Sequence, residues 1–319
     1  MWQALVSTTY QLLDDFRRSW ERARQPAAFP RPATAPVAPN YLPLQRVLLT
    51  DGVSRTLFGE YARHRSASRG DEETGWVLLG LREASEAIVL ATLPAGVEPD
   101  ASTAHIRFNS AGQVVASRIV RQTDRRLTIL GVVHTHPGSL RHPSDGDYRG
   151  DSEWVYHLRG KEGVFGIGTA DAPGSGGTLF AYQPRPYVQC LGALRFSWYT
   201  LRYGASDYRP VPVEMTIGPD LARPLHSLWS VLEAHAERIE RLYKQQAGLR
   251  FEVTSDEWGP GLVLTLPLAE SGDAVRVLVR QKEVRYYVVR GGEVFAVEHS
   301  DDCLDRGVYL LLAELSARA

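Results

Sequence analysis

An apolar run that ends in two histidines constrains this chain more than any other feature. Residues 127–133 read Leu-Thr-Ile-Leu-Gly-Val-Val, which has the length and composition of a buried central strand. His134 and His136 follow at once, separated by Thr135. Because side chains alternate between the two faces of a strand, both imidazoles are expected on the same face of the sheet. The sequence therefore predicts two possible metal ligands side by side at a strand end.

A carboxylate completes the predicted ligand set. Asp147 stands eleven residues after His136, beyond a loop rich in proline and glycine. That loop can turn back and bring the aspartate in from the first turn of the next helix. Two imidazoles and one carboxylate suit Zn²⁺ and leave a fourth tetrahedral position for water, as in catalytic zinc sites. Asp145 is the competing candidate, although its neighbour Gly146 favours a turn there.

Two further residues suit hydrolytic chemistry at such a site. A water nucleophile needs a base, and Glu73 stands just before the predicted strand 76–81. A developing oxyanion needs a donor, and Ser144 lies in the loop three residues before Asp147. Each has an alternative interpretation. Glu73 can be a solvated turn residue, and Ser144 can cap the following helix.

The ordered set His134-Thr135-His136-Pro137, Ser144 and Asp147 resembles the motif of the JAMM metalloproteases, whose catalytic module is the MPN or JAB domain. The stretch 73–80, Glu-Thr-Gly-Trp-Val-Leu-Leu-Gly, is similar to the family's strand entry. There the catalytic glutamate stands seven residues before a glycine, which selects Glu73 over Glu72. The resemblance covers about 44–186.

The resemblance implies an α/β (α+β) fold, with a curved mixed sheet of the MPN/JAB, cytidine-deaminase-like type flanked by helices. It implies one zinc ion per chain on His134, His136 and Asp147, with Glu73 as general base and acid and Ser144 as oxyanion stabiliser. Family members remove ubiquitin or ubiquitin-like proteins from lysines, or process related C-terminal tails. We therefore expect a bacterial deubiquitinase-like isopeptidase or peptidase. Its expected partners are a ubiquitin-like protein or its conjugates, together with conjugation-system enzymes.

Two other functions stay open at this point. One is a non-catalytic MPN-type scaffold, although such domains usually lack a ligand and this chain lacks none. The other is a JAMM hydrolase of another substrate, such as a sulfur-carrier processor, a phage-tail peptidase or a DNA-repair relative. The formal net charge of -1 gives no reason to expect nucleic acid or an anionic membrane as partner.

The remaining sequence indicates a cytoplasmic protein of three parts. No apolar run approaches the roughly 20 residues that span a bilayer, and no signal peptide is expected. The two cysteines, Cys190 and Cys303, imply no disulfide framework. We expect an N-terminal amphipathic helix (1–24) with a Pro/Ala-rich linker to residue 43, a catalytic domain over 44–186, and an α+β accessory domain over 187–319.

Local patterns predict the individual elements. The helices are expected at 51–64, from Asn109 or Ser110 to about 122, and at 147–158, 219–246 and 302–317. The strands are expected at 45–49, 76–81, 87–93, 127–133, 163–169, 178–182, 194–203, 211–217, 249–254, 261–268, 274–281 and 284–297. Gly291-Gly292 can make the last strand a hairpin.

The order of helix, four strands and helix in 219–317 is similar to the ubiquitin-conjugating fold. Cys303 even falls where the conjugating cysteine of that fold would stand. The His-Pro-Asn element that should precede such a cysteine is absent, since residues 298–302 read Glu-His-Ser-Asp-Asp. We therefore interpret this region as an accessory domain that binds substrate or partner, and Cys303 as an incidental thiol.

Overall fold

The computed structural model describes residues 40–95, 110–172, 181–246, 248–268, 272–298 and 303–318. All of these residues belong to the second of two units into which the chain divides, Pro39–Ala319. The helix expected at 1–24, most of the linker and most of the strand expected at 178–182 lie outside the described residues. None of the described helices is long and apolar enough to cross a membrane.

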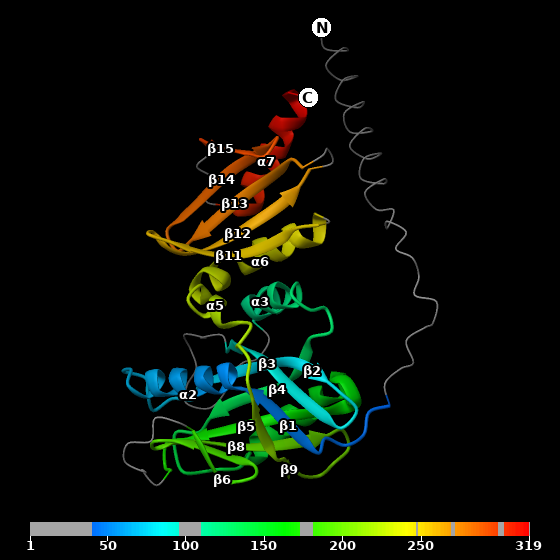
Figure 1. Ribbon diagram of the computed structural model, residues 1–319, viewed down its shortest axis with the longest axis vertical. Coiled ribbons are helices and arrows are strands. Elements are labelled where there is room, and N and C mark those ends of the chain that lie inside the picture. Colours follow the sequence, from blue (N-terminus) through cyan, green and yellow to red (C-terminus); the bar gives the residue numbers. More distant parts are fainter. Residues whose placement is uncertain are drawn as a thin grey trace. The chain divides into compact units, whose positions relative to one another are not determined.

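A curled, mixed, ten-stranded sheet forms the first part of the second unit (Figure 1). Its order is β10-β1-β3-β2-β4-β5-β8-β7-β6, and β9 pairs with β8. The pairs β10–β1, β1–β3 and β4–β5 are parallel, and the other pairs are antiparallel. The strands are β1 (Arg46–Thr50), β2 (Gly75–Arg82), β3 (Glu86–Pro94), β4 (Thr128–Thr135), β5 (Glu162–Thr169), β6 (Tyr182–Arg185), β7 (Val188–Leu191), β8 (Leu194–Arg202), β9 (Arg209–Pro210) and β10 (Val213–Thr216).

This sheet continues past residue 186, where the sequence predicted the accessory domain to begin. Strands β7 and β8 extend the sheet beyond β5, and β10 closes its other edge beside β1. The boundary after Pro186 is therefore corrected to a point after β10, since β8 pairs with β5 and β10 pairs with β1, both far away in the sequence. No local pattern distinguishes a strand that joins an earlier sheet from one that begins a new sheet.

Helices cover both faces of the first sheet and define two cores. Helix α2 (Asp51–Arg65) covers one face, where Phe58 and Tyr61 pack against Phe196 of β8. Helix α3 (Ala111–Arg121) covers the other face, with α4 (Asp145–Trp154) and the 3₁₀ turns Val155–His157 and Arg159–Lys161 near the strand ends. A mixed curled sheet flanked by helices, with a second α+β sheet, confirms the predicted fold class.

The second sheet is a five-stranded antiparallel meander in sequence order. Its strands are β11 (Arg250–Asp256), β12 (Gly259–Pro267), β13 (Ala274–Arg280), β14 (Glu283–Arg290) and β15 (Glu293–Val297), and its helices are α5 (Arg223–His226), α6 (Trp229–Gln245) and α7 (Leu304–Arg318). The expected hairpin at Gly291-Gly292 is confirmed, and both glycines have positive φ. The single helix expected at 219–246 is instead broken into α5 and α6. Pro224 lies in the first turn of α5. Just before that helix, the Asp220 carboxylate accepts a hydrogen bond from the Ala222 amide.

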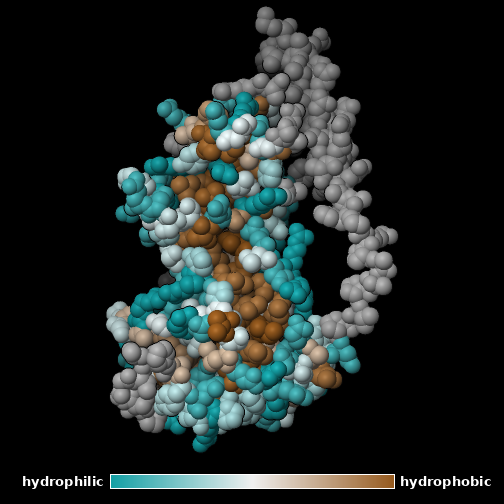
Figure 2. Space-filling view, viewed as in Figure 1, coloured by the Kyte–Doolittle hydropathy of each residue, from teal (hydrophilic) through white to brown (hydrophobic). Residues whose placement is uncertain are grey.

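Helix α3 joins the two sheets, since it packs against α6 as well as against the first sheet. Arg118 of α3 forms a two-pronged ion pair with Glu240 of α6, the shorter contact being 2.8 Å. Its guanidinium also lies 4.4 Å from the centre of the Tyr243 ring. Figure 2 shows apolar side chains gathered over this region, where a cleft of about 340 Å³ lies between α3, α5 and β11.

Candidate metal centre

The two histidines lie at the end of strand β4, on the sheet face that α3 covers. Val132 belongs to the core on that face, and Val133 belongs to the core on the α2 face. Strand alternation therefore directs His134 and His136 to the α3 face, as the sequence predicted. Both histidines are only 7% exposed.

Asp147 comes from the first turn of helix α4, as the loop after the histidines returns to the strand end. Ser144 is the N-cap of this helix and forms a capping box with Asp147. The Ser144 amide donates to Asp147 Oδ2 at 2.6 Å, and the Ser144 hydroxyl donates to the same oxygen at 2.8 Å. The Asp147 amide in turn donates to Ser144 Oγ at 3.2 Å. The cap thus fixes both the start of the helix and the orientation of the carboxylate.

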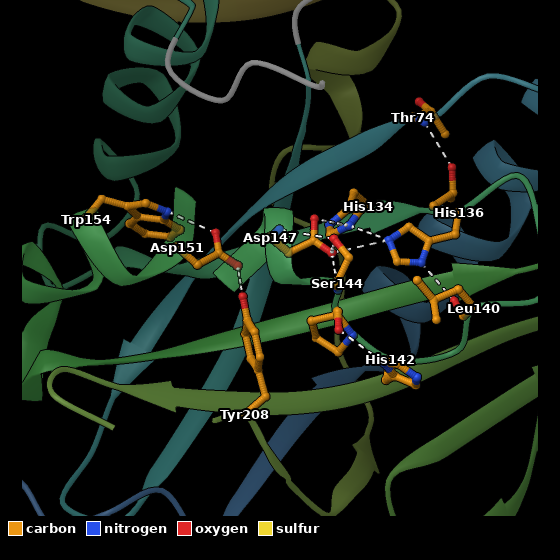
Figure 3. Close-up of polar contacts among 12 residues, drawn as sticks. Thr74, His134, His136, Leu140, His142, Ser144, Asp147, Asp151, Trp154 and Tyr208 are labelled. Atoms are coloured by element: carbon orange, nitrogen blue, oxygen red, sulfur yellow. Dashed lines mark hydrogen bonds and ion pairs between the residues drawn. The ribbon is translucent and has the colours of Figure 1, made fainter. Parts of the chain in front are cut away.

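Three side chains converge on one point (Figure 3). Nε2 of His134 lies 3.0 Å from Nε2 of His136 and 3.1 Å from Oδ1 of Asp147. Nε2 of His136 lies 3.4 Å from Oδ2 of Asp147. The ligand atoms that the three residues offer all lie within 4.8 Å of one another. The sequence-predicted ligand set is therefore assembled in space.

These separations fit a small divalent metal ion. Metal–ligand distances of about 2.0–2.2 Å in a tetrahedral site place neighbouring ligand atoms roughly 3.3–3.6 Å apart. The observed 3.0, 3.1 and 3.4 Å lie within a few tenths of an ångström of that range. Nδ1 of His136 lies 2.8 Å from the Leu140 carbonyl oxygen, which can only accept a hydrogen bond. In the neutral ring the proton of His136 is thereby held on Nδ1, and Nε2 is left with a lone pair for the metal.

The charges around the centre oppose protonation of the aspartate. Burial alone would raise the pKa of Asp147, but hydrogen bonds from His134 and His136 hold that pKa well below its usual range. Burial works against a charged His136, yet its bonds to Asp147 and to the Leu140 carbonyl, with the charges of Asp147 and Glu73, raise its pKa. Asp147 is thus a carboxylate at neutral pH, and a metal ion must compete with a proton for His136.

Glu73 lies directly before strand β2, beside the metal centre. In the antiparallel β2–β4 ladder Gly75 pairs with His134. Thr74 continues this register, since the Thr135 amide donates to its carbonyl at 2.8 Å. One further step places Glu73 opposite His136, on the same face as the ligands. The carboxylate is only half-buried and is close enough to act on the pKa of His136.

Asp145 was the competing ligand candidate in the sequence, and the loop and helix around it hold further histidines and a tryptophan. Asp145 is the first residue of α4, is exposed and lies outside the cluster. His142 is exposed in the loop and lies 3.1 Å from the Pro143 carbonyl. His157 is exposed as well, while Trp154 packs edge-on against Phe165. His105 lies outside the described residues.

Sequence reasoning missed Asp151, a buried carboxylate one helical turn after Asp147. Tyr208 donates to Asp151 Oδ2 at 2.6 Å, and Trp154 Nε1 donates to Oδ1 at 3.1 Å. Burial raises the pKa of Asp151 to about 6. The spacing of four residues from Asp147 on a predicted helix was the signal that could have found it. Tyr208 belongs to the connection between β8 and β9, so no sequence pattern could have paired it with Asp151.

Comparison with known proteins agrees with this geometry. Residues 54–176 match the family model described as prokaryotic homologs of the JAB domain. This part of the chain, which holds the whole His-His-Asp cluster, is thus a JAB (MPN) domain. The JAB family includes metalloproteases. No curated protein matches the chain.

Solved structures also match part of the chain. Among them is the solution structure of a protein from Desulfitobacterium hafniense, with 16% sequence identity and a TM-score of 0.34. The match covers 54% of this chain and 94% of the other.

Proposed function

We propose that this protein is a zinc-dependent isopeptidase or peptidase that removes or processes a ubiquitin-like modifier. The observation that carries the proposal is the convergence of His134, His136 and Asp147 within a JAB domain. Glu73, which the strand register places opposite His136, supplies the acid–base group that hydrolysis requires. A complete ligand set together with this glutamate favours a hydrolase over a scaffold.

The residues that would hold the metal are two neutral imidazoles and one carboxylate. A zinc ion bound there supplies a Lewis acid that polarises a carbonyl and makes a water molecule acidic near neutral pH. His136 is oriented for this by the Leu140 carbonyl, and Asp147 is oriented by the amide and hydroxyl of Ser144. These hydrogen bonds pre-organise the ligands, so that little rearrangement is needed on binding.

Glu73 carries out the proton transfers in this proposal. Its carboxylate takes a proton from the attacking water and later gives that proton to the leaving amine nitrogen. The amine then departs as a neutral group, and the carboxylate is regenerated. A half-buried position at the strand end gives the carboxylate access both to the centre and to a substrate that approaches from solvent.

Ser144 is proposed to stabilise the oxyanion that forms when the amide carbonyl is attacked. In the structure its hydroxyl donates to Asp147 Oδ2. The hydroxyl must therefore turn about its Cβ–Oγ bond to donate to the substrate. The Ser144 amide keeps its own hydrogen bond to Asp147 during that rotation, so the ligand stays in place.

The substrate class rests on the family resemblance and on the chemistry of the site. An amide nitrogen is a poor leaving group and needs the acid that Glu73 provides. We propose a ubiquitin-like protein or its lysine conjugates as substrate, in the cytoplasm and alongside the enzymes of a conjugation system. Processing of sulfur-carrier proteins or of phage-tail proteins would use the same centre, and the choice of substrate in the test distinguishes these.

The test uses the purified full-length chain. Elemental analysis should find about one zinc per chain. The protein should cleave ubiquitin carrying an amide-linked fluorophore at its C-terminus, or the same amide on one of a panel of small bacterial ubiquitin-like proteins. Chelation should abolish cleavage and added zinc should restore it. Glu73→Gln should keep its metal and lose about 10²–10⁴-fold in rate, the usual contribution of a general acid–base group.

Glu72→Gln is the matched control, because Glu72 is the adjacent carboxylate but pairs with Arg69 at 2.5 Å. It should keep wild-type activity. A chain that binds no zinc, or a Glu73→Gln variant as active as wild type, would overturn the proposed mechanism. Zinc binding without cleavage of any amide in the panel would favour a scaffold.

A further inference from the structure

A second carboxylate lies buried close to the metal centre, and the proposed mechanism does not use it. Asp151 of helix α4 is only 9% exposed. Both of its oxygens accept hydrogen bonds from neutral donors, the Tyr208 hydroxyl and the Trp154 indole. Among the residues that the structure describes, no lysine or arginine forms an ion pair with Asp151. Burying an ionised carboxylate that has only neutral hydrogen-bond partners costs free energy. A functional role for Asp151 would explain why this cost is tolerated.

Asp151 lies near the ligands of the centre. It follows Asp147 by four residues on one helix, and side chains at that spacing stand about 5–6 Å apart on the same helix face. The charges of His134 and Asp147 both act on it. Figure 3 shows Asp151 beside Asp147, on the side away from His136. Its negative charge therefore adds to that of Asp147 at this point in the fold.

The hydrogen bonds of Asp151 also hold helix α4 against the first sheet. Tyr208 and Ala205 belong to the segment between β8 and β9, and the Tyr148 hydroxyl donates to the Ala205 carbonyl at 3.0 Å. Tyr148 and Tyr208 themselves pack edge-on, with ring centres 6.3 Å apart. Burial and the Asp151 charge raise the pKa of Tyr208, so its hydroxyl remains a donor. The hydrogen bond of Asp151 to Tyr208 thus holds helix α4, which carries Asp147, against the β8–β9 connection.

We propose that Asp151 is a positioning residue of the metal centre. Its charge favours a divalent cation on the neighbouring ligands, and its bond to Tyr208 fixes the helical turn that carries Asp147. The inference rests on the proposed function, since it assumes that the centre binds a metal. Two carboxylates beside two neutral imidazoles give the region a double negative charge that a divalent cation balances, whereas a single proton on His136 compensates only part of it in the metal-free site.

The test is Asp151→Asn in the full-length chain. Asparagine keeps the size of aspartate, its carbonyl can accept from Trp154 and its amide can donate to the Tyr208 oxygen. The metal-free protein should therefore melt no lower than metal-free wild type. Its affinity for Zn²⁺, measured by competition with a chromophoric chelator, should fall about 10–100-fold, as for other groups that orient metal ligands. A Co²⁺ absorption spectrum should show an altered ligand field.

Asp220→Asn is the matched control. Asp220 is also buried, at 5% exposure, and also accepts several hydrogen bonds, from Thr92 and Ala222. It belongs to the segment before α5, away from the ligand set, so its variant should melt lower and keep wild-type Zn²⁺ affinity. Tyr208→Phe offers a second variant that leaves the Asp151 charge in place, and it should weaken Zn²⁺ binding by less than Asp151→Asn.

The measured Zn²⁺ affinities distinguish a failure of the proposed role of Asp151 from a failure of the proposed zinc-dependent function. If wild type binds Zn²⁺ and both Asp151→Asn and Tyr208→Phe bind it equally well, the role of Asp151 is refuted while the proposed function stands. A lower melting temperature with unchanged affinity would assign Asp151 to stability alone and would also refute it. If wild type binds no metal, both proposals fall together.

Discussion

The imidazole of His226 lies between two acceptors, with Nδ1 2.7 Å from Glu60 Oε1 and Nε2 2.7 Å from the Thr92 carbonyl oxygen. A ring that meets an acceptor at each nitrogen satisfies both only when both nitrogens carry protons. His226 belongs to α5, Glu60 to α2 and Thr92 to β3. A charged histidine thus joins the segment that leads into the second sheet to the JAB domain.

This pair should make stability depend on pH. Burial opposes the charged form of His226, but its bonds to Glu60 and Thr92 raise the pKa above the ordinary value of 6.5. Burial likewise opposes a charged Glu60, but the bond to His226 lowers its pKa below 4.5. The contribution of His226 to the free energy of unfolding is therefore fully present below pH 6.5 and is lost as the pH rises through its raised pKa. The contribution of Glu60 is fully present above pH 4.5 and is lost as the pH falls through its lowered pKa.

We expect His226→Gln to reduce the free energy of unfolding by about 1–3 kcal/mol between these pH values, because it leaves a buried acceptor unpaired. Denaturant unfolding from pH 4.5 to 9 should show the difference from wild type shrinking at the alkaline end. His157→Gln, at an exposed histidine, should track wild type throughout. A difference that stayed constant across the whole range would contradict a charged His226.

Gly131 of strand β4 lies opposite Val164 of β5, where an added side chain has no room. A Cβ atom at this position would lie 1.7 Å from the Val164 carbonyl oxygen, a backbone atom that cannot yield without separating the strands. Gly131→Ala should therefore destabilise the protein by at least about 3 kcal/mol.

Gly59, exposed within α2, is the matched control, because a Cβ atom added there meets nothing within 4 Å. Gly59→Ala should raise stability by about 0.5–1 kcal/mol. Guanidinium unfolding of both variants checks the contrast, and equal effects would refute it.

Two substitutions at Ser144 separate its capping role from its proposed catalytic role. Alanine at an N-cap costs about 1 kcal/mol, whereas glycine costs only a few tenths. Ser144→Ala should therefore lower the melting temperature of the metal-free protein more than Ser144→Gly. Both lack the hydroxyl, so both should lose about 10²–10³-fold in the cleavage rate. If the rate instead followed stability, with the glycine variant nearly as active as wild type, Ser144 would be a helix cap only.

Much of the candidate site was predictable because it rests on local rules. Strand alternation is enough to place His134 and His136 on one face, and a capping serine is enough to begin the helix that carries Asp147. The structure assembles these three residues as predicted. Most strands and helices also fall where hydrophobic periodicity indicated them, because that periodicity is a property of each segment alone.

Three features could not be obtained in this way, since each depends on segments far apart in the sequence. The register that sets Glu73 opposite His136 depends on how β2 and β4 pair. The extent of the first sheet depends on β8 and β10 finding partners in β5 and β1. The partner of Asp151 is Tyr208, from a connection 57 residues later. Residue types and local periods determined which side chains can bind a metal here. Only tertiary packing decided which other groups surround them, because register and burial are set by long-range contacts that no single segment encodes.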